Sequence, residues 1–153
     1  MSTLENDDGL VDAKPKTPWH LWVVGILAVL WNSGGAVDYT MTQTQNKDYL
    51  SQFTPEQLDY FSSFPAWADA FWASGVWGAF IGSLLILLRS RHALTAFVIS
   101  LFGLAGSTVH QLIGDMPPSL NTPGIWVFTA VIALSIILLI IYVRKMKANG
   151  VLR

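Results

Sequence analysis

The residues of this sequence that could do chemistry are a small group of polar side chains on or beside long apolar stretches. They are Asn32, Asp38, Asp69, His110 and Gln111. Inside a membrane, an amide forms hydrogen bonds to a neighbouring helix or to a solute. A histidine can also exchange a proton near neutral pH, and Asp115 follows His110 at a short distance along the chain. This group therefore predicts a polar layer that contacts a solute or joins the helices, with Asn32 and His110 bonding to a ligand or to each other.

Catalytic and metal-binding motifs are not recognisable among these residues. A zinc site needs three or four converging ligands, and only His110, Asp38 and Asp69 are candidates. His20 and His92 could ligate haem as a pair, but nothing beside them specifies it. No Gly-x-Ser-x-Gly turn of a serine hydrolase occurs, and the chain has no cysteine. We therefore predict no metal, no cofactor and no enzymatic activity.

Four apolar stretches must position the polar residues. Hydrophobic residues make up 52% of the 153 residues and charged residues only 12%, whereas soluble domains usually carry about 25% charged residues. Stretches of about 18 or more mostly apolar residues are long enough to cross the hydrocarbon core as helices. The sequence therefore predicts an all-α integral membrane protein, a bundle of four transmembrane helices. The predicted spans are about 19–36, 67–88, 93–113 and 125–143.

The two ends of the chain are predicted to be tails of a membrane domain over residues 17–147. Residues 1–16 contain four acidic residues and two lysines, which is typical of a disordered segment, and residues 148–153 form a short second tail. The acidic residues before the first apolar run, and the lack of an Ala-x-Ala site after it, favour a retained span over a cleaved signal peptide.

The distribution of basic residues predicts the orientation. Eight of the nine Lys and Arg lie in the N-terminal tail, in the turn between the second and third spans, or near the C-terminus. Lys47 alone lies on the other side. Because Lys and Arg near span ends tend to stay in the cytoplasm, we expect both termini there, in a multi-pass protein of the cell inner (plasma) membrane. The near balance of 9 basic and 10 acidic residues gives no basic surface for nucleic acid.

The long loop between the first two spans contains a capped stretch, FTPEQLDYFSSFP. Thr54 can be the N-cap, Pro55 the first helical residue, and Gln57 the other member of a capping box. Apolar residues follow at helical spacing. We predict a short amphipathic helix over residues 55–61 on the outer membrane surface, with a capped turn as the alternative.

Small residues predict which faces of the spans meet, because they let two helix backbones approach closely. The predicted packing residues are Gly25 and Gly35 in the first span, Ser74, Gly78 and Gly82 in the second, and Gly103 and Ser107 in the third. The fourth span has the weakest pattern of this kind and is expected to be the most exposed to lipid. Asp69 lies on the opposite face of its helix from Gly78, so we expect it to reach water.

Two long stretches resemble a known family. PWHLWVVGILAVLWNSGGAVDYTMTQTQ, followed by FTPEQLDYFSSFPAWADAFWASGVWGAFIGSLLILLR, is similar to small four-span inner-membrane proteins of Gram-negative bacteria whose members often carry the label of sugar transporter. The resemblance covers Pro18 to about His110. It implies a place in the inner membrane and suggests a sugar as a substrate, but it implies no functional residues.

Two hypotheses about function follow. The preferred one is an accessory or interaction subunit of a larger membrane complex, docked through the GxxxG face of Gly78 and Gly82 and through the aromatic outer loop. The alternative is a transporter of a small solute such as a sugar, working as a homo-oligomer, with the polar layer as an outward-facing mouth. An unwound segment at NSGG in the first span would favour transport.

Overall fold

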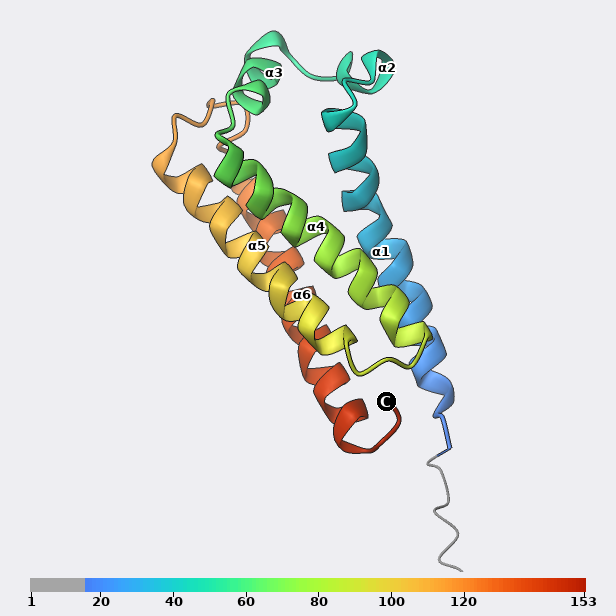
Figure 1. Cartoon of the computed structure of the whole chain (residues 1–153). Coiled ribbons are helices and arrows are strands. Elements are labelled where there is room, and N and C mark those ends of the chain that lie inside the picture. The colour runs from blue at the N-terminus through green and yellow to red at the C-terminus, as the bar shows by residue number, and fades with distance from the viewer. Residues whose placement is uncertain (1–15) are drawn as a thin grey trace, which may run out of the picture.

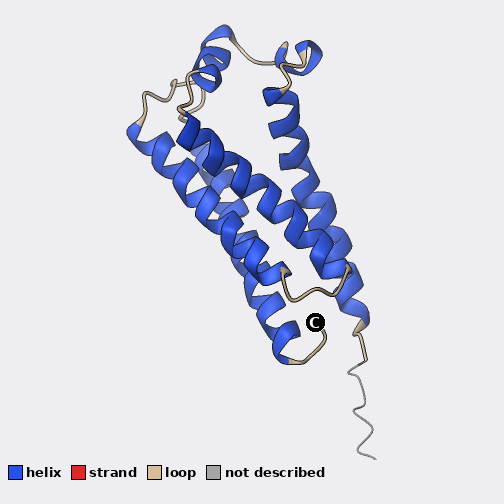
Figure 2. Cartoon of the chain, viewed as in Figure 1, coloured by secondary structure: helices blue, strands red, loops and turns tan. Residues whose placement is uncertain are grey.

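The computed structural model describes residues 16–153, and these residues form helices and loops without strands (Figures 1 and 2). In chain order the helices are α1 (Trp19–Gln43), α2 (Lys47–Leu50), α3 (Pro55–Ser62), α4 (Ala66–Leu87), α5 (Ala93–Ile113) and α6 (Pro123–Ala148). The predicted disorder of residues 1–16 lies outside the described residues, except for Lys16.

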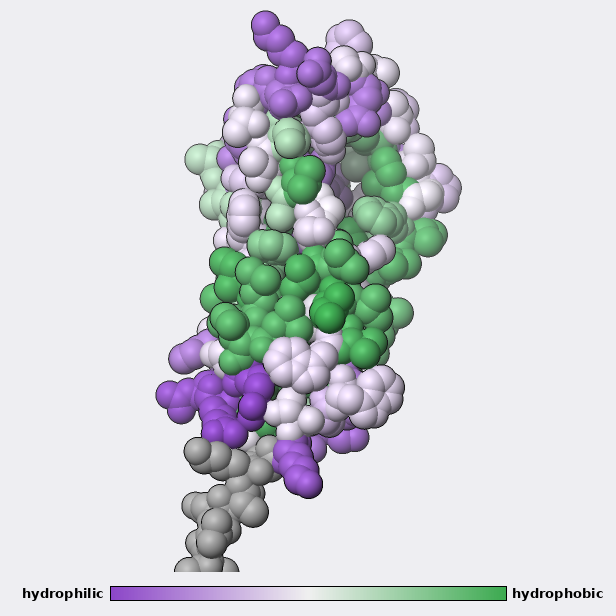
Figure 3. Space-filling model, turned by 90° about the vertical axis from the view of Figure 1, so that its right-hand side faces the viewer, coloured by the Kyte–Doolittle hydropathy of each residue, from purple (hydrophilic) through white to green (hydrophobic). Residues whose placement is uncertain are grey.

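Four of these helices, α1, α4, α5 and α6, are long and apolar enough to cross a membrane. Figure 3 shows a band of apolar side chains between two more polar ends of the molecule. Because lipid offers no hydrogen bonds, a helix satisfies its backbone groups internally and can expose such a band. The chain is therefore a multi-pass membrane protein, as the composition predicted.

The predicted spans coincide with these four helices except at their ends. α1 continues to Gln43 instead of ending near residue 36, and it passes through NSGG without interruption. The unwound segment that would have favoured transport is therefore not formed at Gly34 and Gly35. α6 likewise extends to Ala148, beyond the predicted end at residue 143.

The four long helices form a row in the order α1, α4, α5, α6. α4 packs against α1 and α5, and α6 packs against α5. α1 diverges from α4 toward the end of the molecule that carries α2 and α3, which we call the loop end (Figure 1). α1 and α6 meet near the start of α1, where the Nδ1 of His20 and the hydroxyl of Tyr142 form a hydrogen bond of 2.7 Å. They meet again at Trp31 and Phe128, whose ring centroids are 6.2 Å apart. Elsewhere among the described residues, α1 and α6 are not packed against each other.

At the opposite end, which we call the terminal end, all four long helices share an apolar core. Its buried side chains include Leu21, Ile86, Phe97, Val143, Met146, Val151 and Leu152. Residues after α6 fold back into this core. Two backbone hydrogen bonds of 2.9 Å hold them to the turn after α4: the N–H of Arg153 donates to the carbonyl of Arg89, and the N–H of Arg91 donates to the carbonyl of Arg153. The C-terminal residues thus close the terminal end.

The contact between α4 and α5 depends on glycine. A methyl group added to Gly103 of α5 would overlap the backbone of Gly75 and the carbonyl oxygen of Phe71 in α4. One added to Gly78 would lie 2.9 Å from the carbonyl oxygen of Ala96 in α5, and one at Gly82 would press on the ring of Phe97. The GxxxG face of α4 therefore packs against the chain's own α5.

The predicted packing residues differ in how they are used. Gly25 of α1 leaves room for the side chain of Leu87 in α4. A methyl group added to Gly35 would lie 3.8 Å from the side chain of Val76 in α4, which is an ordinary contact distance. Ser74 donates instead to the carbonyl of Ala70 in its own helix at 2.7 Å. The neighbouring Gly75 takes the place in the α4–α5 contact that we predicted for Ser74.

Candidate functional site

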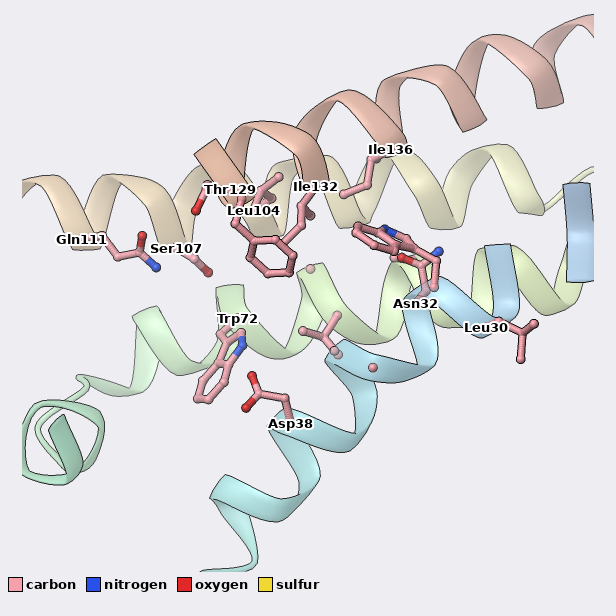
Figure 4. Close-up of a pocket in the computed structure, with 17 residues that line it drawn as sticks. Leu30, Asn32, Asp38, Trp72, Leu104, Ser107, Gln111, Thr129, Ile132 and Ile136 are labelled. Carbon is pink, nitrogen blue, oxygen red and sulfur yellow. The ribbon is translucent and has the colours of Figure 1, made fainter. Parts of the chain in front are cut away.

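A cavity of about 540 Å³ lies between α1, α4, α5 and α6, on the loop-end side of the core (Figure 4). The divergence of α1 from α4 and the opening between α1 and α6 create this space. Its apolar lining includes Leu30, Trp31, Trp72, Val76, Ala79, Leu104, Phe128, Ile132 and Ile136. Its polar lining consists of Asn32, Asp38, Ser107, Gln111 and Thr129. Cavities of this size, mostly apolar with a few polar groups, are typical of small-molecule sites.

Two polar atoms on the α5 wall of the cavity have no hydrogen-bond partner among the described residues. They are the Oγ of Ser107 and the Oε1 of Gln111, both buried and about one helical turn apart. Figure 4 shows the two side chains on the same side of the space, across from α1. A buried polar group left unpaired costs about 1–3 kcal/mol. These atoms are therefore available to a bound molecule.

The position of Ser107 corrects the prediction that it packs against another helix. Its neighbour Gly106 makes that contact, because a methyl group at Gly106 would overlap the ring of Phe71 in α4. Since successive helical residues point about 100° apart, Ser107 is turned away from α4 and toward the cavity. The prediction rested on the spacing of four residues between Gly103 and Ser107. That spacing does not distinguish the face of α5 that packs against α4 from the face that lines the cavity.

Asp38 is the only charged residue among the described residues that line the cavity. Its carboxylate lies beside the indole of Trp72 (Figure 4), and its Oδ1 accepts a hydrogen bond of 2.5 Å from the hydroxyl of Tyr49 in α2. Burial and this hydrogen bond raise the pKa of Tyr49 to about 12. The phenol therefore stays protonated at neutral pH and continues to donate to Asp38. Sequence analysis did not find Tyr49, because the contact depends on α2 folding back over α1.

Asn32 is buried and joins α1 to α4. Its Nδ2 donates to the Oγ of Ser83 and to the carbonyl of Ala28, both at 3.0 Å. Ser83 in turn donates to the carbonyl of Ala79 in its own helix. The partner of Asn32 is thus Ser83, and the structure does not form the bond between Asn32 and His110 that was one of the two alternatives left open by the sequence. The signal that could have found Ser83 is its place as a hydroxyl within the apolar second half of α4, next to Gly82.

His110 lies outside the cavity lining, within a cluster of aromatic rings from the loop end. Its ring centroid is 4.6 Å from that of Phe64, 5.3 Å from Trp67 and 6.2 Å from Tyr60. Its Nδ1 is buried without a hydrogen-bond partner among the described residues, and so is the hydroxyl of Tyr60. The structure therefore separates His110 from the other predicted polar residues.

Asp69 also lies outside this cavity. Its Oδ1 accepts a hydrogen bond of 2.6 Å from the Nε2 of Gln43, which joins the start of α4 to the end of α1. Asp69 lines a second, more polar cavity of about 610 Å³ bounded by the end of α1, the loop helix α3 and the start of α4. Of the five predicted polar residues, the structure thus brings Asn32, Asp38 and Gln111 together and places His110 and Asp69 elsewhere.

Among residues 16–153, no three His, Asp or Glu side chains converge in a way that could hold a metal ion. The polar atoms of the first cavity come from one carboxylate, two amides and two hydroxyls. Such a set can orient a small molecule by hydrogen bonds and charge.

No model of a protein family, no curated protein and no solved structure matches the chain.

Proposed function

We propose that this protein binds a small molecule in the cavity between α1, α4, α5 and α6, and that the cavity is the substrate site of a small-solute transporter. The observation that carries the proposal is the pair of buried, unpaired polar atoms on α5, Ser107 Oγ and Gln111 Oε1. Such atoms need a hydrogen-bond partner, and a molecule bound in the cavity can supply one.

The accessory-subunit hypothesis loses one of its two supports. It relied on the GxxxG face of Gly78 and Gly82 and on the aromatic outer loop as docking surfaces, and the GxxxG face is covered by α5 of the same chain. Of the four long helices, α6 has the smallest buried share, and α1 and α5 also expose large apolar side chains. Lipid alone is sufficient to cover such a surface, so α6 by itself does not call for a partner.

We infer the orientation from the basic residues. Arg89 and Arg91 follow α4, and Arg144, Lys145 and Lys147 lie near the end of α6. All of them belong to the terminal end, which by the positive-inside rule faces the cytoplasm of a cell with the protein in its inner membrane. The loop end and the cavity then belong to the outer half, with α3 on the outer surface.

Because the chain has no cysteine, labelling can test this orientation. Glu56 of α3 and Lys147 of α6 are both exposed and lie at opposite ends. A membrane-impermeant maleimide should label Glu56→Cys in intact cells and Lys147→Cys only after the membrane is opened. The reverse pattern would place the cavity in the inner half of the membrane.

The closed core at the terminal end suits an outward-facing state. Val151 and Leu152 are each 4% exposed and pack with Leu21 and Phe97 across the path to the cytoplasm. Release on that side would require this core to separate. The site itself could stay in place while the helices at the terminal end move.

A binding measurement tests the proposal directly. Purified protein in lipid nanodiscs would be screened by thermal shift against small solutes, including sugars, amines and amphipathic cations. We expect at least one class of solute to stabilise the wild type. That solute should bind the double variant Ser107→Leu, Gln111→Leu at least about ten-fold more weakly, a loss of roughly 1.4 kcal/mol in binding free energy. The matched control is Thr95→Leu, an exposed hydroxyl on the same helix that does not line the cavity.

The double variant also separates a ligand site from a structural role. Because it removes two unpaired buried polar atoms, it should fold at least as stably as the wild type while losing the ligand. Equal binding by the wild type and the double variant for every ligand found, or no ligand at all, contradicts the proposal. Equal uptake into vesicles carrying either form removes transport while leaving binding.

A further inference from the structure

We propose that the ligand of the cavity is a lipophilic cation. This inference rests on the proposed function, since it names the chemical class that the same cavity takes. It starts from Asp38, the only charged side chain among the described residues of the lining. A carboxylate at an apolar surface within the membrane is costly unless a positive charge lies nearby, and no Lys or Arg among the described residues lines this space. A cationic ligand supplies the missing charge.

The hydroxyl of Tyr49 satisfies only one atom of this carboxylate. It donates to Oδ1, while Oδ2 accepts no hydrogen bond from the described residues. Tyr49 remains a neutral donor at physiological pH, because burial and the bond to Asp38 raise its pKa to about 12. The contact thus holds the carboxylate in position without neutralising its charge. The Oδ2 of Asp38 is therefore available to a bound molecule.

Aromatic rings around the carboxylate favour a cation with apolar substituents. Trp72 lies directly beside Asp38 (Figure 4), and the rings of Trp31 in α1 and Phe128 in α6 also line the cavity. The face of an indole ring attracts cations, most strongly when water is excluded. The remaining lining is aliphatic, so it suits hydrocarbon groups attached to the charged centre. The opening between α1 and α6 lets such a molecule enter from the membrane, where lipophilic cations accumulate.

The same lining is unfavourable for a sugar. A monosaccharide carries a hydroxyl on most of its carbons, and each buried hydroxyl without a partner costs about 1–3 kcal/mol by the measure of protein mutations. Beyond Asp38, the described residues of the lining offer the indole N–H groups of two tryptophans and the polar groups of Asn32, Ser107, Gln111 and Thr129. Asn32 already uses its Nδ2 on Ser83 and Ala28. An anionic ligand would in addition meet the charge of Asp38.

The experiment compares two probes of similar shape and different charge on the unchanged protein. Tetraphenylphosphonium is a lipophilic cation, and triphenylphosphine oxide is a neutral relative. Equilibrium binding to wild-type protein in nanodiscs of zwitterionic lipid, read by tryptophan fluorescence, should be at least about ten-fold tighter for the cation. Asp38→Asn should remove this preference, whereas Asp59→Asn, an exposed carboxylate on α3, should retain it.

Each outcome has a clear meaning. If the two probes bind equally to the wild type, or if Asp38→Asn keeps the preference for the cation, the inference about charge is overturned. Should both probes bind the wild type equally and neither bind the Ser107→Leu, Gln111→Leu variant, the inference fails while the proposed small-molecule site stands. Absence of binding by both probes also overturns the inference, and the proposed function then depends on the wider panel. The comparison on wild-type protein needs no variant to fold.

Discussion

Buried polar side chains in this protein fall into two groups. Asn32 and Ser83 satisfy each other across α1 and α4, and such bonds contribute on average only about 0.6 kcal/mol in membrane proteins. Ser107, Gln111 and His110 each keep a buried atom without a partner. The first two face a cavity, and the third faces aromatic rings. The group that an unpaired atom faces therefore distinguishes a ligand site from a packing site: Ser107 and Gln111 face open space, and His110 faces packed rings.

His110 provides a test of this distinction. Replacing it with Phe should leave the free energy of unfolding unchanged or raise it, because the ring contact with Phe64 remains and the unpaired Nδ1 is removed. His110→Ala should lower the unfolding free energy by about 2–4 kcal/mol, because it leaves a void among the rings. Both values can be measured by denaturant unfolding in mixed micelles. A loss for His110→Phe as large as for His110→Ala would indicate that the imidazole has a polar partner.

Among the helices, the contact between α4 and α5 is the closest in the molecule. Gly75 and Gly103 face each other without side chains, and Ser100 donates to the carbonyl of Gly75 across the same contact. α1 is held to α4 less tightly, which allows it to diverge toward the loop end and open the cavity. The elements thus divide into a tight pair, α4 and α5, and two outer helices, α1 and α6, on either side of the cavity.

Substitution of two glycines by alanine should separate packing from helix propensity. Gly103→Ala should lower the free energy of unfolding by about 1–3 kcal/mol, because the new methyl group meets the backbone of α4, which cannot rotate away. Gly34→Ala is the control, since nothing lies within 4 Å of the added methyl group. It should raise the unfolding free energy by up to about 1 kcal/mol through helix propensity. Similar effects of the two changes would contradict the close approach of α4 and α5.

For the molecule as a whole, closure at one end and opening at the other are the defining features. The C-terminal residues complete the core of the terminal end, while the loop end is held by α2, by the aromatic cluster of α3 and by the bond between Gln43 and Asp69. The cavity lies between these two regions. Its lateral opening between α1 and α6 follows from the row arrangement of the four long helices.

Removal of residues 151–153 tests the closure of the terminal end. The truncation should lower the free energy of unfolding by about 2–5 kcal/mol, because the buried side chains of Val151 and Leu152 leave a void against Leu21 and Phe97. Arg153→Ala is the matched control, since the bonds of Arg153 to Arg89 and Arg91 involve backbone atoms only. An unchanged unfolding free energy after truncation would show that these residues do not complete the core.

Sequence alone determined the existence and the approximate location of the four spans, because the length and apolarity that a membrane requires are local properties of a helix. It also indicated that Asn32, Asp38 and Gln111 belong to a polar region. Tertiary structure decided which faces of the helices meet. Gly75, and not Ser74, packs against α5, and Ser83, and not His110, is the partner of Asn32. Neighbouring positions on a helix differ by only 100°, so small-residue spacing fits several rotations equally well. The cavity exists only once α1 diverges from α4, and no local pattern encodes that angle.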